Sequence, residues 1–137
     1  MRKIKKRSNC PMSYCLDFVG DKWVLLILRD MILHKKLYFK DFLKSDEGIA
    51  TNVLSDRLKM LEQRGFITSK KDALQKTMKI YSLTQQGKDV LPLLIEMLLW
   101  SSKYGDFGPE QEQLDDSAEL IRADKETFIQ NILNAIP

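Results

Sequence analysis

The segment between residues 51 and 64 constrains the fold more than any other part of the chain. Leu54, Leu58 and Leu61 follow one another at intervals of four and three residues, which is the spacing of one apolar stripe along an α-helix. At about 100° per residue the opposite side of this helix is polar. That side presents Asn52, Asp56, Lys59 and Gln63, flanked by Thr51 and Ser55. The pattern predicts a helix that is buried along one side and open to a partner along the other.

Two short strand patterns, 66–71 and 77–83, follow this helix after Gly65, a residue typical of helix ends. The first reads Phe-Ile-Thr-Ser-Lys-Lys and the second Thr-Met-Lys-Ile-Tyr-Ser-Leu. The polar link between them, 72–76, predicts a β-hairpin. Lysines mark the arms and the tip of this hairpin, at Lys70, Lys71, Lys76 and Lys79.

The chain before residue 51 predicts further helices. A helix over 10–19 is favoured by Pro11, because proline suits the first helical position. Asp21 caps the next helix, which runs to about residue 34, is apolar on nearly every side and should therefore lie at the centre of the core. The segments expected after it are an extended stretch at 36–39 and a small helix at 41–44.

The segment after the hairpin is the most apolar of the chain. Thr84 caps a helix predicted to run to about Tyr104, and between residues 90 and 100 only Pro92 and Glu96 interrupt the apolar side chains. Pro92 should kink this helix. A helix that is apolar on every side needs cover on every side, and a chain of 137 residues has little left to supply it. We therefore expect a second subunit to cover this helix.

Charge divides the chain into a basic body and an acidic end. Residues 1–105 carry 20 Lys and Arg against 11 Asp and Glu, whereas residues 106–137 carry 2 against 8. This asymmetry is typical of a polyanion-binding domain joined to a segment with another role, although an unevenly charged, solvated surface is the alternative. The acidic end predicts a last amphipathic helix over 116–135, a second candidate for dimerisation. One face of it holds Ala118, Ile121, Phe128 and Ile132.

Several function classes lack any support in the sequence. No run approaches the roughly 18 apolar residues of a membrane span, and the basic N-terminus is not followed by the apolar stretch of a signal peptide. We therefore expect a cytoplasmic protein without a membrane partner. Cys10, Cys15 and the single His34 cannot form a zinc cluster or a disulfide framework. Without paired acids, a nucleophile with its base or a phosphate loop, no residue has a catalytic role, and we expect neither an enzyme nor a cofactor.

The order of a polar-faced helix and a basic hairpin fits double-stranded DNA. Such a helix can enter the major groove, about 12 Å wide, while the hairpin lies along the neighbouring backbone. Asn52 can pair with adenine and Lys59 can donate to guanine, whereas Asp56 can accept from cytosine or pair with Lys59. The hairpin lysines would neutralise phosphates, which adds affinity without sequence information. The alternative is that this face of the helix is merely solvated.

Several motifs of the chain are shared with a known family. They are Cys10-Pro11, Leu16-Asp-Phe-Val-Gly-Asp-Lys-Trp23, Leu26-Ile-Leu-Arg-Asp30, Phe39-Lys-Asp-Phe42, Ile49-Ala-Thr-Asn-Val-Leu-Ser-Asp-Arg-Leu58, Leu61-Glu62, Gly65 and Tyr81-Ser-Leu-Thr84 with Gly87. In these motifs the chain resembles the HxlR-type regulators, which are winged-helix bacterial transcription factors related to the MarR group. The resemblance covers about residues 10–104, and the combination of Gly-x-Lys-Trp with Leu-Ser-x-Arg-Leu is specific.

The resemblance implies a mainly α-helical winged helix-turn-helix with a small β-hairpin and flanking dimerisation helices. Residues 1–9 would be a basic tail, either a DNA-contacting arm or a solubilising segment. Residues 10–104 would be the DNA-binding domain with its dimerisation helices, and 105–137 an acidic dimerisation helix. In that family the helix matching 51–64 is the recognition helix and the hairpin is the wing. The expected activity is that of a homodimeric, sequence-specific transcriptional regulator on an inverted repeat, with half-sites about 34–36 Å apart.

The residues expected to contact DNA come from these elements. They are Lys40, Thr51, Asn52, Ser55, Asp56, Arg57, Lys59, Lys70, Lys71, Lys76 and Lys79. Arg57 matches a characteristic arginine of the family, and we expect it to brace the wing or to meet a phosphate. A winged-helix module that binds another protein is the rival function. The affinity of such a module would depend little on salt, whereas DNA binding weakens steeply as salt rises.

The chain departs from the family pattern at three places. Ala50 stands where a serine usually caps the recognition helix, a loss of about 1 kcal/mol unless Thr51 takes over. Lys40 replaces the usual serine or asparagine cap before Asp41 and can serve a phosphate instead. The wing has Lys76-Thr-Met78 where Pro-Pro-Arg is common.

Cys10 has two interpretations. Some family members use the cysteine of the matching Cys-Pro pair as a redox sensor, and a helix N-terminus beside a basic tail favours the reactive thiolate. An intersubunit disulfide would then be the oxidised product, and the effector an oxidant or a small electrophile. Alternatively, Cys10 is an inert reduced cysteine. We expect Cys15 on a packed face, both Trp23 and Trp100 in the core, and His34 at a helix C-terminus or on the surface.

Overall fold

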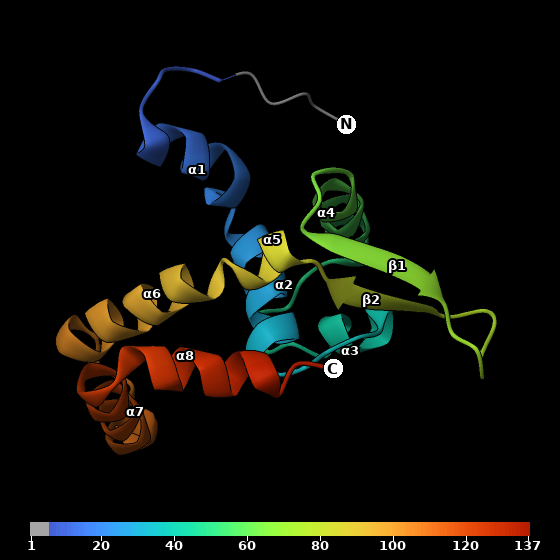
Figure 1. Ribbon diagram of the computed structural model, residues 1–137. Coiled ribbons are helices and arrows are strands. Elements are labelled where there is room, and N and C mark those ends of the chain that lie inside the picture. Colours follow the sequence, from blue (N-terminus) through green and yellow to red (C-terminus); the bar gives the residue numbers. More distant parts are fainter. Residues whose placement is uncertain (1–5) are drawn as a thin grey trace.

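The computed structural model describes residues 6–137 and consists of helices with one antiparallel hairpin (Figure 1). In chain order the elements are α1 (Pro11–Val19), α2 (Lys22–Leu33), α3 (Phe39–Leu43), α4 (Thr51–Gln63), β1 (Ile67–Lys71), β2 (Lys79–Leu83), α5 (Gln85–Lys88), α6 (Leu91–Tyr104), the 3-10 turn η1 (Gly108–Glu110), α7 (Gln111–Ala123) and α8 (Lys125–Asn134). The predicted mainly helical fold with a small hairpin is confirmed. Of the basic tail predicted at 1–9, residues 1–5 lie outside the described part of the chain.

The core is built around α2, as its apolar pattern predicts. Asp21 caps this helix, and its carboxylate accepts the Trp23 N–H at 2.8 Å. Val24 and Leu28 are fully buried, while Trp23 packs against the core from its edge. The leucine stripe of α4 closes one side, with no leucine more than 2% exposed. Other elements add Phe42, Ile67, Leu91, Ile95 and Ile121 to the same core.

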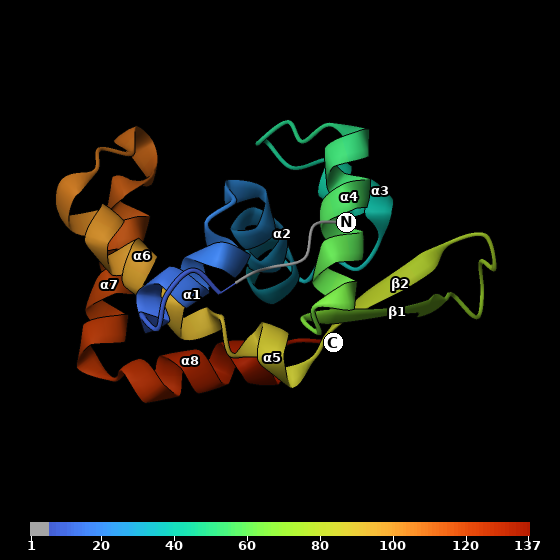
Figure 2. The ribbon, with the colours of Figure 1, turned by 90° about the horizontal axis from the view of Figure 1, so that it is seen from above.

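The elements separate into two ends. Figures 1 and 2 show α4 and the hairpin at one end, and α6 and α7 at the other, with α2 between them. The hairpin is a two-stranded sheet in which Ile67 pairs with Leu83 at the base and Lys71 with Lys79 at the outer end. The order of helix, helix, hairpin is that of a winged helix-turn-helix, so α4 takes the place of the recognition helix and the hairpin that of the wing.

The corner that joins α4, the hairpin and α5 is tightly packed. Gly65 has a φ of +85°, a backbone conformation that glycine adopts without strain. The Thr84 hydroxyl donates to the Gly65 carbonyl at 2.5 Å and accepts the Gly87 N–H at 3.2 Å. A Cβ atom added to Gly87 would lie only 2.2 Å from the carbonyl oxygen of Phe66. This position therefore admits glycine alone without a shift of the backbone.

Replacing Gly87 with alanine is expected to lower the free energy of unfolding by about 1–3 kcal/mol, because the new methyl group forces α5 away from the Phe66 backbone. Chemical denaturation measures this difference. Gln85→Ala is the matched control, since Gln85 lies in the same short helix but is exposed, and it should change the stability by no more than about 0.5 kcal/mol. Equal losses in the two variants would contradict the packing argument.

The single helix predicted from Thr84 to Tyr104 is wrong, because it is two helices. α5 ends at Lys88, α6 begins at Leu91, and Pro92 lies in the first turn of α6. The N–H groups of a first turn have no acceptor within their own helix, so proline, which lacks an N–H, fits there better than in the interior. A break therefore takes the place of the predicted kink.

The helix predicted over 116–135 is also two helices, and it begins earlier, at Gln111. Asp124 separates α7 from α8 as the N-cap of α8. Its carboxylate accepts the Thr127 N–H at 3.1 Å and the Thr127 hydroxyl at 2.6 Å. The predicted apolar face is present: Ala118 and Ile121 are buried, and α8 packs against the core through the partly buried Phe128 and Ile132.

Two smaller expectations are corrected as well. Residues 36–39 do not form a strand. The Leu37 carbonyl accepts the Tyr81 N–H at 2.9 Å, and α3 already begins at Phe39 instead of residue 41. Trp100 is 67% exposed and does not lie in the core.

Candidate nucleic-acid interface

The outer face of α4 is open to solvent, as its polar pattern predicts. The stripe Leu54, Leu58 and Leu61 faces the core, and the side chains on the opposite side stay accessible. The predicted contact residues Thr51, Asn52, Asp56 and Lys59 are exposed, and Ser55 and Arg57 are partly buried. Ala50 precedes the helix without a side-chain cap, so the expected loss of a cap there is confirmed, and α4 begins at Thr51.

The hairpin places its lysines on two different faces. Lys71 and Lys79 are paired across the strands, so their side chains share one face. Lys70 belongs to the other face, and Lys76 lies exposed in the turn between the strands. The four lysines predicted as one group are therefore not all brought together. Like charges directly opposite each other destabilise a hairpin, so the Lys71–Lys79 pair favours an anion beside it.

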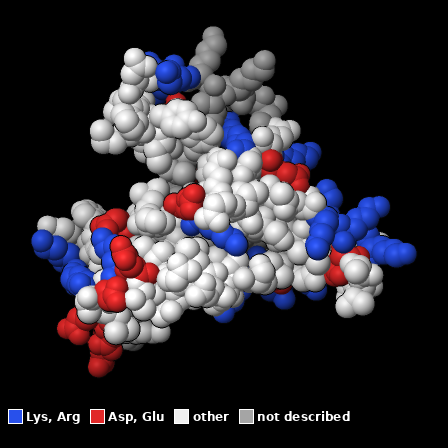
Figure 3. Space-filling view, viewed as in Figure 1, with Lys and Arg blue, Asp and Glu red and all other residues white. Residues whose placement is uncertain are grey.

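The surface charge follows the same division into two ends. Figure 3 shows lysine and arginine side chains over the outer end of the hairpin, whereas acidic side chains, with some basic ones among them, lie at the opposite end, over α6 and α7. Because residues 106–137 carry 2 Lys and Arg against 8 Asp and Glu, the hairpin end is the more basic of the two. A polyanion would be drawn to the end that carries the hairpin.

The hydrogen bonds of Arg57 go to Asp21 and Asp56 and not to the wing, so the first of the two roles expected for it is wrong, whereas a contact with a phosphate stays a prediction. Its Nε donates to Oδ2 of Asp21 at 2.6 Å, and its Nη1 donates to Oδ2 of Asp56 at 2.6 Å. Partial burial lowers the pKa of Arg57, but the hydrogen bonds that it donates to Asp21 and Asp56 outweigh burial and raise that pKa, so the guanidinium stays charged. Asp56 is thus paired with Arg57 and not with Lys59. Asp21, which the sequence marked only as a helix cap, also holds the recognition helix.

Lys40 is exposed, but it does not occupy the cap position expected for it. The N-cap of α3 is Tyr38, whose N–H donates to Oδ2 of Asp41 at 3.3 Å. Lys40 is the second residue of the helix, and its Nζ lies 5.8 Å from the centre of the Tyr38 ring. Its predicted contact with a phosphate stays a prediction.

Cys15 lies within α1 and Cys10 directly before it, so both cysteines are distant in sequence from α4. Cys10 is the N-cap of this helix and its thiol makes no cap hydrogen bond. Both cysteines are exposed, so the packed face expected for Cys15 is wrong. His34 is exposed at the C-cap of α2, in agreement with either role expected for it. Within residues 6–137 no cluster of three metal-binding side chains and no helix long and apolar enough to cross a membrane is found.

Comparison with known proteins assigns the fold to a family. A model described as HxlR-like helix-turn-helix matches residues 18–108, which include α2, α4 and the whole hairpin. The chain belongs to the HxlR-like family. Among its relatives is BH0655 of Halalkalibacterium halodurans, named an uncharacterised HTH-type transcriptional regulator. The two are 31% identical over 102 residues, which cover 74% of this chain and 89% of BH0655.

Solved structures of similar proteins share this architecture. PA1607, assigned as a transcription factor, is 33% identical to this chain and superposes with a TM-score of 0.66, covering 76% of this chain and 70% of PA1607. The redox regulator HypR in its oxidised form is 29% identical, with a TM-score of 0.60 over 72% of this chain and all of HypR. Membership of the HxlR-like family favours DNA binding over a protein-interaction module.

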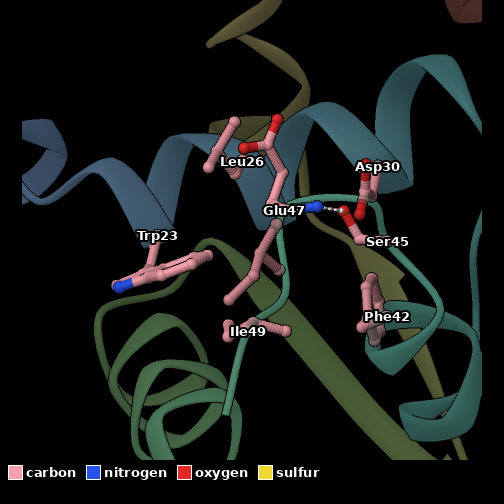
Figure 4. Close-up of a pocket in the computed structure, with 8 residues that line it drawn as sticks. Trp23, Leu26, Asp30, Phe42, Ser45, Glu47 and Ile49 are labelled. Carbon is pink, nitrogen blue, oxygen red and sulfur yellow. Dashed lines mark hydrogen bonds between the residues drawn. The ribbon is translucent and has the colours of Figure 1, made fainter.

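This chain has a small, partly open cavity beside α2. Figure 4 shows that Trp23, Leu26 and Ile49 line one part of it, and Phe42 and Ser45 another. The loop before α4 closes it, and the Glu47 N–H donates to the Ser45 hydroxyl at 3.3 Å. Its volume of about 10 Å³ is room for about one water molecule. The cavity is therefore too small for an effector.

Proposed function

We propose that this protein is a transcriptional regulator that binds double-stranded DNA as a homodimer in the cytoplasm. The observation that carries the proposal is the exposed polar face of α4 beside a hairpin on which Lys71 and Lys79 lie opposite each other. A helix of this kind fits the major groove, and the paired lysines fit the phosphates that flank it. Asn52 and Lys59 are the residues that we assign to base edges.

A second copy of the chain is the partner that α6 fits. Its inner side carries the buried Leu91 and Ile95, whereas its outer side is apolar as well. The exposed side chains recur at intervals of four, three and four residues and therefore form one stripe. They are Leu93, Met97, Trp100 and Tyr104. α1 also exposes Met12, Tyr14 and Leu16. Apolar faces of this kind mark protein interfaces, and dimerisation through the terminal helices would place two recognition helices on an inverted repeat.

We propose further that Cys10 makes this regulator responsive to oxidants. Its thiol is exposed at the N-terminus of α1 and makes no cap hydrogen bond, so an oxidant can reach it. The similarity to the redox regulator HypR supports the same role. Oxidation by a peroxide would join two Cys10 thiols of the dimer. The thiols lose two protons and two electrons, and the peroxide takes them up and becomes two molecules of water or alcohol.

Fluorescence anisotropy with the DNA upstream of the protein's own gene tests the proposal. The logarithm of the binding constant should fall by about 0.9 for each phosphate contact per tenfold rise in salt. Mild peroxide should weaken binding in the wild type and in Cys15→Ser but not in Cys10→Ser. Selective binding that peroxide does not change would contradict only the proposed redox role of Cys10. If the protein does not bind this DNA selectively and a genome-wide search finds no bound site either, the protein-interaction module is the better function.

Arg57→Ala is expected to weaken operator binding about tenfold, because it leaves the Asp56 carboxylate without its partner, facing the phosphates; like charges across an interface are costly. The double variant Arg57→Ala/Asp56→Asn should recover most of the lost affinity, since the asparagine side chain at position 56 carries no charge. Anisotropy titrations at constant salt measure both. If the double variant binds as weakly as Arg57→Ala, then Arg57 acts on DNA directly and not through Asp56.

A further inference from the structure

The outer end of the hairpin is held by a contact between residues far apart in the chain. The Tyr38 hydroxyl donates to Oδ2 of Asp72 at 2.9 Å. Asp72 is the first residue after β1, and at 8% exposure it is one of two buried charged residues in the described part of the chain. Its Oδ1 accepts the Leu74 N–H at 3.0 Å, and its own N–H donates to the Met78 carbonyl at 2.9 Å. One carboxylate thus joins the turn of the hairpin to Tyr38.

The charge state of this pair suits a permanent contact. The Leu74 N–H and the Tyr38 hydroxyl both stabilise the carboxylate and hold the pKa of Asp72 below its usual range. The same hydrogen bond raises the pKa of Tyr38, so the phenol keeps its proton. Donor and acceptor are therefore both in the required form at neutral pH. Asp72 lies next to Lys71 in sequence, but its carboxylate accepts a hydrogen bond from the neutral Tyr38 hydroxyl.

Tyr38 connects the hairpin to the helix-turn-helix. It is the N-cap of α3, and its N–H donates to Asp41 within that helix. Its neighbour Leu37 accepts the Tyr81 N–H from β2 at 2.9 Å. The short linker between α2 and α3 therefore contacts β2 through Leu37 and the far end of β1 through Tyr38. Since α3 packs against α4, this linker relates the direction of the hairpin to that of the recognition helix.

A two-stranded hairpin is only marginally stable in water, so its outer end needs such an attachment to keep one direction. We propose that the Tyr38–Asp72 hydrogen bond is the positioning contact of the wing, which holds Lys71 and Lys79 at the phosphates while α4 occupies the major groove. The inference rests on the proposed DNA binding and adds two positioning residues to it. Neither residue touches DNA in this arrangement; both act through the paired lysines.

The test measures operator binding against salt for the full-length chain. Tyr38→Phe and Asp72→Ala should each weaken binding about fivefold and lower the salt slope by about 1, because one phosphate contact is no longer held. Asp72→Asn keeps an acceptor for the Tyr38 hydroxyl and should bind nearly as well as the wild type. Ser102→Ala is the matched control, since it removes a hydroxyl–carboxylate hydrogen bond, from Ser102 to Asp115 at 3.0 Å, at the other end of the molecule, and it should leave the salt slope unchanged.

A double-mutant cycle separates positioning from a general structural role. If Tyr38 acts through the lysines, Tyr38→Phe should add nothing to the loss already caused by Lys71→Ala/Lys79→Ala. Hydrogen exchange of residues 72–78 in the unbound protein should also be faster in Tyr38→Phe than in Ser102→Ala. An unchanged slope for Tyr38→Phe, or an undiminished effect in the lysine-free background, overturns the inference. A wild type that binds no DNA overturns the proposed function, and this inference with it.

Discussion

Replacing Trp100 with glutamate is expected to abolish the proposed dimer and to weaken operator binding by at least about 100-fold, because the avidity of two linked half-sites is lost. Trp100 is 67% exposed at the centre of the apolar stripe on α6, and its ring lies 5.4 Å from that of Tyr104. A carboxylate in a desolvated apolar interface has no partner there, so association becomes unfavourable.

Sedimentation velocity measures the oligomeric state of this variant, and anisotropy its affinity for the operator. Leu120→Glu is the control, because Leu120 is similarly exposed, at 63%, but lies on α7. It should remain dimeric if α6 forms the interface. Dissociation of Leu120→Glu together with an intact Trp100→Glu dimer would place the interface on the C-terminal segment, the second candidate for dimerisation, instead of on α6.

The double variant Lys71→Ala/Lys79→Ala is expected to lower the salt slope of operator binding by about 1.8 and the affinity by about 10- to 50-fold at physiological salt. The two lysines share one face of the hairpin and lie opposite each other, so both meet the same stretch of backbone. Removing them should also slightly stabilise the unbound hairpin, since their mutual repulsion disappears.

Lys70→Ala is the sharpest control for this pair. Lys70 is adjacent to Lys71 in sequence and equally exposed, but its side chain belongs to the opposite face of the hairpin. It removes one positive charge from the same strand, so a general effect of net charge would appear in it as well. We expect its slope to stay close to that of the wild type. If Lys70→Ala lowers the salt slope by about half as much as the double variant does, then only the net charge of the hairpin matters.

Elements with a strong local pattern were predicted well. The stripe Leu54, Leu58 and Leu61 specifies α4, because three leucines at helical spacing have only one way to be buried together. Asp21 caps α2 as expected, since capping requires only the residue and the N–H two positions further on. The hairpin followed from two strand patterns and a polar link. Each of these signals lies within a few residues of the structure that it specifies.

The breaks in the C-terminal helices were missed, although the sequence holds a signal for one of them. Asp124 with Thr127 three residues later is a capping pair, and it separates α7 from α8. The continuous apolar pattern on both sides of it obscured this signal. Pro92 was correctly predicted to interrupt the helical segment, but as a kink inside one helix. It lies instead in the first turn of a separate helix, where proline fits equally well.

The partners of the charged and polar side chains could not be predicted. Arg57 pairs with Asp21, 36 residues away, and Tyr38 with Asp72, 34 residues away. Nothing in the spacing of these residues distinguishes them from other acids and bases of the chain. A side chain reaches over only a few ångströms, so its partner depends on which helices and strands the core brings together.

The sequence by itself determined the class of fold, the polar face of α4, the basic hairpin and the family, because periodicity and motifs act over short stretches of backbone. Only the tertiary structure decided that Lys79 lies opposite Lys71 and not opposite Lys70, that Asp56 is paired with Arg57, and that Trp100 is exposed. These outcomes depend on strand register and on the packing of whole helices against the core. They arise only when elements distant in sequence meet.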